Sequence, residues 1–146
     1  MNVWELIVQV VSAFFGVLAV AIVFQVPKKY LVLTGLTGAG GWFVNLILME
    51  LTGNAIFTSF LAAFVVAIMS QIFARAFKSP VTLYLVTGIL PLVPGIGMYR
   101  TVYFLLHDNR EMVSYYLSYT LQVAGMIALA IFVVDSFFKI LYRKRS

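Results

Sequence analysis

The stretch GILPLVPGIGMYR, residues 88–100, places two prolines, three glycines and an arginine inside a long run of apolar residues. Pro91 has no N–H to donate to the carbonyl of Thr87, and Pro94 has none for the carbonyl of Leu90. Each proline ring also crowds the carbonyl that it leaves unpaired, and the glycines tolerate backbone angles that other residues avoid. A helix through this stretch is therefore predicted to be interrupted and not merely kinked.

The composition of the whole chain indicates a membrane protein. Of its 146 residues, 63% are hydrophobic and 10% are charged, and the mean hydropathy is +1.04. A soluble domain of this size has no means of burying so much apolar surface. The net charge of +5 comes from short clusters between apolar runs. Because these clusters form no basic face with interleaved aromatic residues, nucleic acid is not expected as a partner.

The first residues and the cysteine count exclude further classes. No basic residue precedes the first apolar run, and no small-residue cleavage pattern follows it, so a cleaved signal peptide is not expected. The chain has no cysteine, which excludes disulfides and thiolate metal sites. The whole chain, residues 1–146, is predicted to form a single polytopic transmembrane domain.

Five apolar segments are predicted to cross the membrane as α-helices, at about residues 3–26, 30–51, 55–77, 80–106 and 112–141. Each reaches or exceeds the roughly 20 residues that cross a hydrocarbon core of about 30 Å. Ser79 and Pro80 are expected to be the N-cap and the first helical residue of the fourth span. The predicted fold is an all-α integral membrane protein whose fourth span is interrupted by a Pro-x-x-Pro-Gly motif.

The basic residues predict the orientation of these spans. One set of span ends carries Lys28, Lys29, Arg75, Lys78, Lys139, Arg143, Lys144 and Arg145. The loops at the other ends carry only Arg110. Cytoplasmic loops are enriched in lysine and arginine, so the N-terminus is expected outside and the C-terminus inside.

Small residues at four-residue spacing predict how the spans pack, because helices in lipid approach closely where side chains are small. The second span has Gly35 with Ala39, Thr34 with Gly38 and Thr37 with Gly41; the third has Ser59, Ala63 and Ala67; the fifth has Ser114, Ser118, Ala124, Gly125 and Ala128. Each of these faces is expected to pack against another helix. A substrate path along the glycine-rich face of the second span is the alternative.

The interrupted fourth span also predicts a binding site. A second half-helix that begins near Gly95 would direct free N–H groups and a partial positive charge into the protein. Arg100 follows within about a turn and can add a bidentate contact to a carboxylate. The predicted site residues are Pro91, Pro94, Gly95, Gly97 and Arg100. Broken helices of this kind recur at the binding sites of secondary transporters.

Alternatives remain for the same residues. The prolines can serve packing alone, and Arg100 can extend its side chain to the lipid headgroups. The carbonyls of Thr87 and Leu90, exposed by the break, can receive an ammonium group, a proton-carrying water or a sodium ion. The sequence leaves these alternatives open.

The other polar residues predict contacts and no catalysis. Asn45, Gln71 and Gln122 are expected to form hydrogen bonds between helices, with a place along a path as the alternative. Glu50 is expected to be an interfacial carboxylate, and Asp135 is expected to pair with Lys139 four residues later. His107 is the lone histidine, and no positioned nucleophile accompanies it. An enzyme is therefore not expected, and no cofactor or metal site is predicted.

The order of these motifs resembles the threonine/serine exporter family. The motif at 88–100 follows a VPKK loop at 26–29, the glycine-rich TGLTGAGGW at 34–42 and a span that ends in ARAFKSP at 74–80. The resemblance is to the small C-terminal membrane part of that family and covers nearly the whole chain.

The resemblance implies export of small carboxylate-bearing metabolites: threonine and serine, or a dicarboxylate such as succinate. It implies a larger membrane subunit as partner, the plasma membrane of a prokaryote and coupling to an ion gradient whose ion is unknown. Five spans are few for two bodies that move around a central site, which also favours a second subunit or a homo-oligomer. The alternative is an accessory subunit that transports nothing and stabilises its partner.

Overall fold

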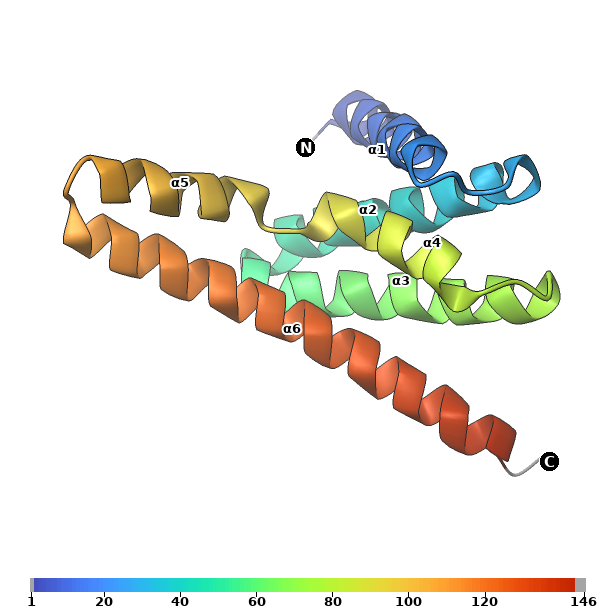
Figure 1. Ribbon diagram of the computed structural model, residues 1–146. Helices are drawn as coiled ribbons and strands as arrows, with labels where there is room; N and C mark the ends of the chain where they lie inside the picture. The colour runs from blue at the N-terminus through green and yellow to red at the C-terminus, as the bar shows by residue number, and fades with distance from the viewer. Residues whose placement is uncertain (1, 144–146) are drawn as a thin grey trace.

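The computed structural model describes residues 2–143, which are helical apart from short connections (Figure 1). The helices are α1 (Val3–Val23), η1 (Lys28–Tyr30), α2 (Leu31–Thr52), α3 (Ala55–Ala76), α4 (Val81–Ile89), η2 (Leu90–Leu92), α5 (Gly95–Leu106) and α6 (Arg110–Arg143). Their bounds differ by at most three residues from those expected of the five spans. Lys144 and Arg145, which the orientation argument used, lie outside the described residues.

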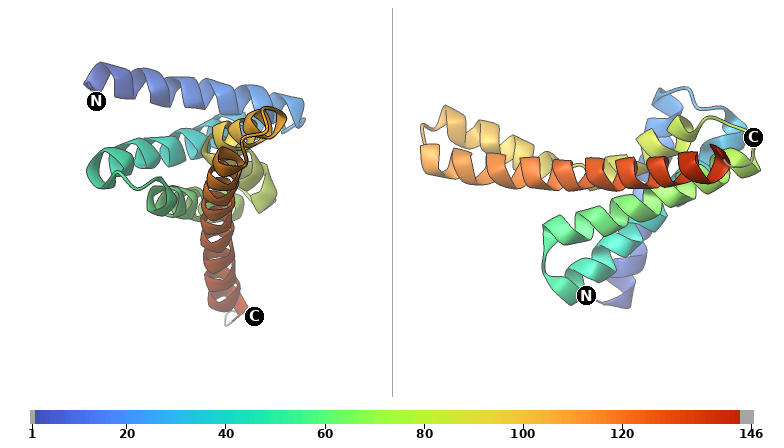
Figure 2. Two further views of the ribbon diagram at one scale, coloured as in Figure 1. Left: turned by 90° about the vertical axis from the view of Figure 1, so that its left-hand side faces the viewer. Right: turned by 90° about the horizontal axis from the view of Figure 1, so that it is seen from below.

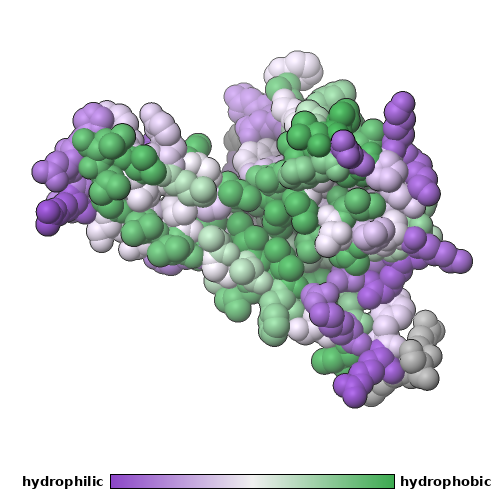
Figure 3. Space-filling model, viewed as in Figure 1, coloured by the Kyte–Doolittle hydropathy of each residue, from purple (hydrophilic) through white to green (hydrophobic). Residues whose placement is uncertain are grey.

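Four of these helices are long and apolar enough to cross a membrane: α1, α2 together with η1, α3 and α6. The pair formed by α4 with η2 and by α5 is bent by 53° at its break, and counts as a fifth span if the pair crosses once. Figure 3 shows apolar residues over the middle of one face, with hydrophilic residues gathered at the tip of the α5–α6 turn and toward the opposite end. The chain is thus a multi-pass membrane protein.

The described helices form a bundle and a hairpin, which share one apolar core cluster. Helices α1, α2 and α3 pack side by side, and α4 lies against α2 and α3; these four form the α1–α4 bundle. Within residues 2–143, α5 packs against α6 alone, and α6 packs against α5 and α3. The α5–α6 hairpin therefore meets the bundle mainly where α6 crosses α3. Figures 1 and 2 show the hairpin diverging from the bundle toward the α5–α6 turn.

Glycines bring the helices of the bundle into close contact. A Cβ at Gly38 would overlap the side chain of Val17 on α1, and a Cβ at Gly41 would overlap Val66 on α3. The small residues predicted to pack in the second and third spans are buried: Thr34, Gly35, Thr37, Gly38, Ala39 and Gly41, and Ser59, Ala63 and Ala67. This part of the packing prediction is confirmed.

The packing prediction for the last span is wrong within this chain. Ser114, Ser118, Ala124, Gly125 and Ala128 are all exposed on α6, and a Cβ at Gly125 would meet nothing within 4 Å. The buried face of α6 is the opposite one: Thr120, Val123, Ile127, Ala130 and Val134. Because α6 touches its neighbours through that face, the small residues on its other side stay exposed.

The start of α4 also differs from the expectation. The helix begins at Val81, and Pro80 occupies the N-cap position without a capping side chain. The hydroxyl of Ser79 lies 2.8 Å from the hydroxyl of Tyr84 instead. Tyr84 is fully buried, and the rings of Tyr30 and Phe73 pack edge-on against it. Ser79 thus satisfies a buried tyrosine and does not cap the helix.

Candidate functional site

The predicted interruption of the fourth span is present, and it has a defined geometry. After α4, the turn η2 ends at Leu92, and Val93 is extended (φ −61°, ψ 131°). Pro94 is the N-cap of α5 (φ −76°, ψ 60°), and α5 begins at Gly95, the residue at which the second half-helix was expected to begin. Since neither proline can donate a backbone hydrogen bond, the chain leaves the helix between them and resumes at the glycine.

Of the first four N–H groups of α5, two have a backbone acceptor within residues 2–143 and two do not. The N–H of Gly95 donates to the carbonyl of Val93 (2.7 Å), and that of Met98 donates to the carbonyl of Pro94 (3.1 Å). No backbone carbonyl in the described residues accepts from the N–H of Ile96 or Gly97. These two groups lie in the first turn of α5, where the helix dipole adds partial positive charge.

The carbonyl of Leu90 is partly used within the break. It accepts a hydrogen bond from the N–H of Val93 at 3.2 Å, so the tight turn uses the carbonyl that the proline at 94 cannot pair. A cation at this point would use the second lone pair of this oxygen.

A cavity of about 970 Å³ lies beside the break. All five predicted site residues line it: Pro91, Pro94, Gly95, Gly97 and Arg100. The rest of its wall comes from α2, from the α2–α3 turn at Gly53 and Asn54, from the start of α3 and from the first half of α6. The cavity is therefore the space that opens where the α5–α6 hairpin diverges from the α1–α4 bundle.

Among residues 2–143, Arg100 is the single charged residue that lines this cavity. Its guanidinium donates a hydrogen bond to the hydroxyl of Tyr116 on α6 (2.7 Å) and lies 5.2 Å from the centre of the Tyr116 ring. Phe104 also stacks on Tyr116, with 5.6 Å between the two ring centres. The arginine is thus held at the cavity by α6 and has donors left for an anion.

The two glycines of the site have different surroundings. Gly97 is buried, and a Cβ there would overlap the hydroxyl of Thr120 on α6, so this glycine permits the close contact between α5 and α6. The Gly97 carbonyl also accepts from the hydroxyl of Thr101 at 2.8 Å. A Cβ at Gly95 would meet nothing within 4 Å. Gly95 therefore has open space around the position of a Cβ, unlike Gly97.

The predictions for the three amide side chains have three different outcomes. Gln71 donates to Asp135 of α6 at 3.2 Å, which confirms a hydrogen bond between helices. Asn45 lines the cavity without a side-chain hydrogen bond in the described residues, so the alternative place along a path describes it better. Gln122 is exposed on α6 and likewise makes no such bond there, so its predicted helix contact is wrong.

Tyr116 is the site residue that the sequence reasoning missed. A signal was available: Arg100 and Tyr116 lie at equal distances from the turn at 107–109, and residues so placed in an antiparallel helical hairpin lie at the same level. The position of Tyr116 near the start of the last span is typical of an aromatic residue at the lipid interface. The hydrogen bond places it in the wall of the cavity.

The comparison with protein families gives one match that covers most of the chain. Residues 9–137 match the family described as "Threonine/Serine exporter, ThrE". No solved structure matches the chain. The matched range includes the small-residue faces, the broken fourth span and the cavity residues, and this chain therefore belongs to the threonine/serine exporter family.

Proposed function

We propose that the chain is a membrane subunit of a secondary exporter for small carboxylate-bearing metabolites, either threonine and serine or a succinate-like dicarboxylate. It lies in the plasma membrane of a prokaryote with its N-terminus outside, works with a larger membrane subunit of the same family and uses an ion gradient. The observation that carries this proposal is the cavity at the helix break, whose wall includes both the start of α5 and Arg100.

The cavity offers what a carboxylate needs. The N–H groups of Ile96 and Gly97 have no backbone acceptor in the described residues, and they can donate to the two carboxylate oxygens or share one. Arg100 adds a full positive charge on the same side, from a side chain that Tyr116 already orients. In the described part of the chain, no acidic side chain lines the cavity to oppose an anion.

The exposed face of α6 supports the need for a second subunit. We define the α6 small face as Ser114, Ser118, Ala124, Gly125 and Ala128, all exposed in this chain. In lipid, such faces favour close approach of another helix. The same face also fits the second candidate function, in which the chain is an accessory subunit that only stabilises its transporting partner.

Efflux measurements separate the two candidates. Cells that lack both subunits would be loaded with labelled threonine, serine or succinate, and would express this chain, the larger subunit, or both. We expect efflux only when both are present, because the cavity supplies one part of the site and the partner completes the path. Efflux with the larger subunit alone would leave this chain an accessory, and the labelled compound that leaves the cell identifies the substrate class.

A leucine at Gly125 is expected to weaken the complex with the larger subunit. The leucine has open space in this chain, so the isolated protein should fold as well as the wild type. It would nevertheless fill the α6 small face, where a partner helix needs close approach. Co-purification with the tagged larger subunit measures the effect.

Gly16→Leu is the matched control for that experiment. Gly16 is also an exposed helical glycine whose Cβ would meet nothing within 4 Å, but it lies on α1, away from α6. We expect Gly16→Leu to retain the partner. Equal retention in the two variants would show that the α6 small face does not bind the larger subunit.

A further inference from the structure

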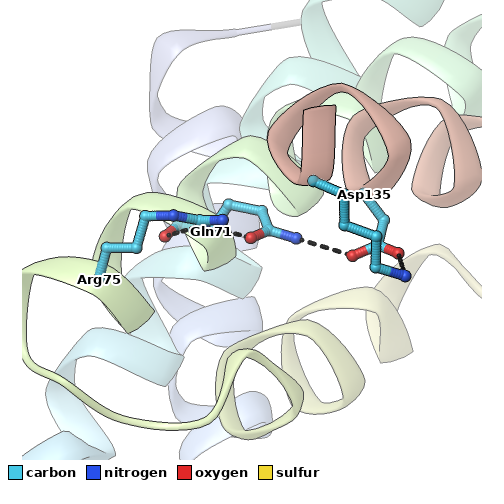
Figure 4. Close-up of polar contacts among 4 residues, drawn as sticks. Gln71, Arg75 and Asp135 are labelled. Carbon is cyan, nitrogen blue, oxygen red and sulfur yellow. Dashed lines mark hydrogen bonds and ion pairs between the residues drawn. The ribbon is translucent and has the colours of Figure 1, made fainter. Parts of the chain in front are cut away.

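A chain of polar contacts joins α3 to α6 (Figure 4). The side-chain amide of Gln71 donates to Asp135 at 3.2 Å, and Asp135 forms an ion pair with Lys139 at 2.7 Å. On the α3 side, Arg75 donates both to the backbone carbonyl of Gln71 (3.0 Å) and to its side-chain oxygen. We call these four residues, Gln71, Arg75, Asp135 and Lys139, the α3–α6 clamp.

Arg75 reinforces the clamp through two aromatic rings of α6. Its guanidinium carbon lies 4.6 Å from the ring centre of Phe138 and 4.2 Å from that of Tyr142. Gln71 is buried, with only 5% of its surface exposed. A buried amide that donates across to α6 favours one register of the two helices, because separation would leave that donor unsatisfied, while its oxygen stays paired with Arg75 within α3.

The clamp and the cavity lie at opposite ends of the contact between α3 and α6. Along α3, Ile56 and Ser59 line the cavity, and Gln71 lies about three turns further on. Along α6, Tyr119 and Val123 line the cavity, and Asp135 lies in the second half of the helix. The protein is thus open at one end of this contact and closed at the other.

The stretch between the two ends is apolar. Ala63 of α3 and Ile127 and Ala130 of α6 are buried in one core cluster there. Within the described residues, the bond between Gln71 and Asp135 is the one side-chain hydrogen bond that joins α3 to α6. The hairpin has one further link to the bundle, the broken connection at Val93 and Pro94.

We propose that the α3–α6 clamp is a gate that closes the transport path at the end opposite the cavity. When the clamp separates, the α5–α6 hairpin turns about its apolar contact with α3, so that the cavity closes at its present mouth and opens past Gln71. The inference rests on the proposed exporter function. It assigns the two moving bodies, the α1–α4 bundle and the hairpin, to a single chain.

Cysteine accessibility tests the gate, because the chain has no native cysteine. Asn45→Cys reports on the cavity, and Ala130→Cys reports on the closed contact between the cavity and the clamp. Purified protein in vesicles would be treated with a membrane-impermeant maleimide from one face or the other. With the clamp intact, we expect the thiol at position 45 to react from one face only and the thiol at position 130 to react from neither.

Breaking the clamp should expose position 130 to the face from which position 45 does not react. Gln71→Leu and Asp135→Leu, each combined with Ala130→Cys, remove the contact from its two sides, so either variant that folds is informative. We expect labelling at position 130 to accelerate by about tenfold, the population shift that corresponds to the loss of one ordinary hydrogen bond. Gln9→Leu makes the same change at an exposed glutamine of α1 and should leave position 130 protected.

The labelling result is independent of the substrate and of efflux. If position 130 stays protected in folded clamp variants, the clamp is not a gate, whatever the efflux assay shows. If the thiol there becomes reactive equally from both faces, or equally in Gln9→Leu, the change is general loosening and the proposal fails. A loss of efflux on replacement of Arg100, with unchanged labelling at position 130, bears only on the binding site.

Discussion

Replacement of Arg100 by methionine is expected to lower efflux by about tenfold or more while the protein still inserts at wild-type levels. A charge-assisted hydrogen bond contributes about 1.5–3 kcal/mol, which corresponds to roughly 10- to 150-fold in affinity. Methionine keeps the length and the apolar stem of the side chain, so the change removes chiefly the charge and the donors. Initial efflux rates at matched protein levels measure the effect.

Two further variants show how Arg100 acts. Arg100→Lys keeps the positive charge but has no planar fork, so we expect intermediate efflux if the substrate carboxylate is held by two parallel bonds. Tyr116→Phe removes only the hydroxyl that accepts from Arg100, and its effect should be smaller. Wild-type efflux in Arg100→Met would place the binding site elsewhere and would leave Arg100 as a residue that contacts lipid headgroups.

Gly41→Ala is expected to lower the stability of the protein by about 1–3 kcal/mol, the usual cost of overpacking a core. The added methyl group would overlap the side chain of Val66 on α3, at the point where α2 and α3 touch beside the break. Helix α2 cannot move away freely, because its Gly38 is also in close contact with Val17 of α1. The thermal unfolding midpoint in detergent measures the loss.

A second substitution should relieve the overlap. Val66→Ala removes the methyl groups that the new Cβ would meet, so Gly41→Ala combined with Val66→Ala should be more stable than the sum of the two single changes predicts. Gly125→Ala is the control, since its Cβ would meet nothing within 4 Å. Strict additivity of Gly41→Ala and Val66→Ala would mean that the two residues are not in contact in the membrane.

The sequence predicted the spans and the break because both follow from local properties. The length of an apolar run is a property of the run, and a proline without an N–H interrupts a helix whatever surrounds it. The start of α5 at Gly95 followed for the same reason. Small residues at helical spacing likewise predicted the contacts of α2 and α3, since glycine allows helices to approach wherever a neighbour exists.

The faces of α6 could not be assigned in the same way. In water the buried face of a helix is the apolar one, but lipid is as apolar as a protein core, so hydropathy does not distinguish them. By hydropathy alone, either the α6 small face or the face that carries Val123 and Ile127 could be the buried one. In the structure, the face with Val123 and Ile127 is buried. The sequence likewise could not identify Asp135 as the partner of Gln71, because the two residues meet only where the assembled helices α3 and α6 cross.

The sequence predicted the residues that the helix break contributes to the candidate site, but not those that other helices contribute to the cavity wall. Pro91, Pro94, Gly95, Gly97 and Arg100 come from one short stretch, and all of them line the cavity. Asn45 and Tyr116 come from other helices, and they reach the cavity only because the hairpin diverges from the bundle. That divergence depends on the bend of 53° at the break, whose size no local pattern encodes.

The length of α6 links the protein to the thickness of its bilayer. A helix of 34 residues extends about 51 Å, well beyond a hydrocarbon core of about 30 Å. Such a helix fits a thin membrane by tilting further, and a thicker one lets it stand more upright. Since α6 carries α5 with it, its tilt changes the angle between the hairpin and the bundle. Acyl-chain length would thereby change the width of the cavity, so that the lipid composition of the membrane would directly affect the geometry of the candidate site.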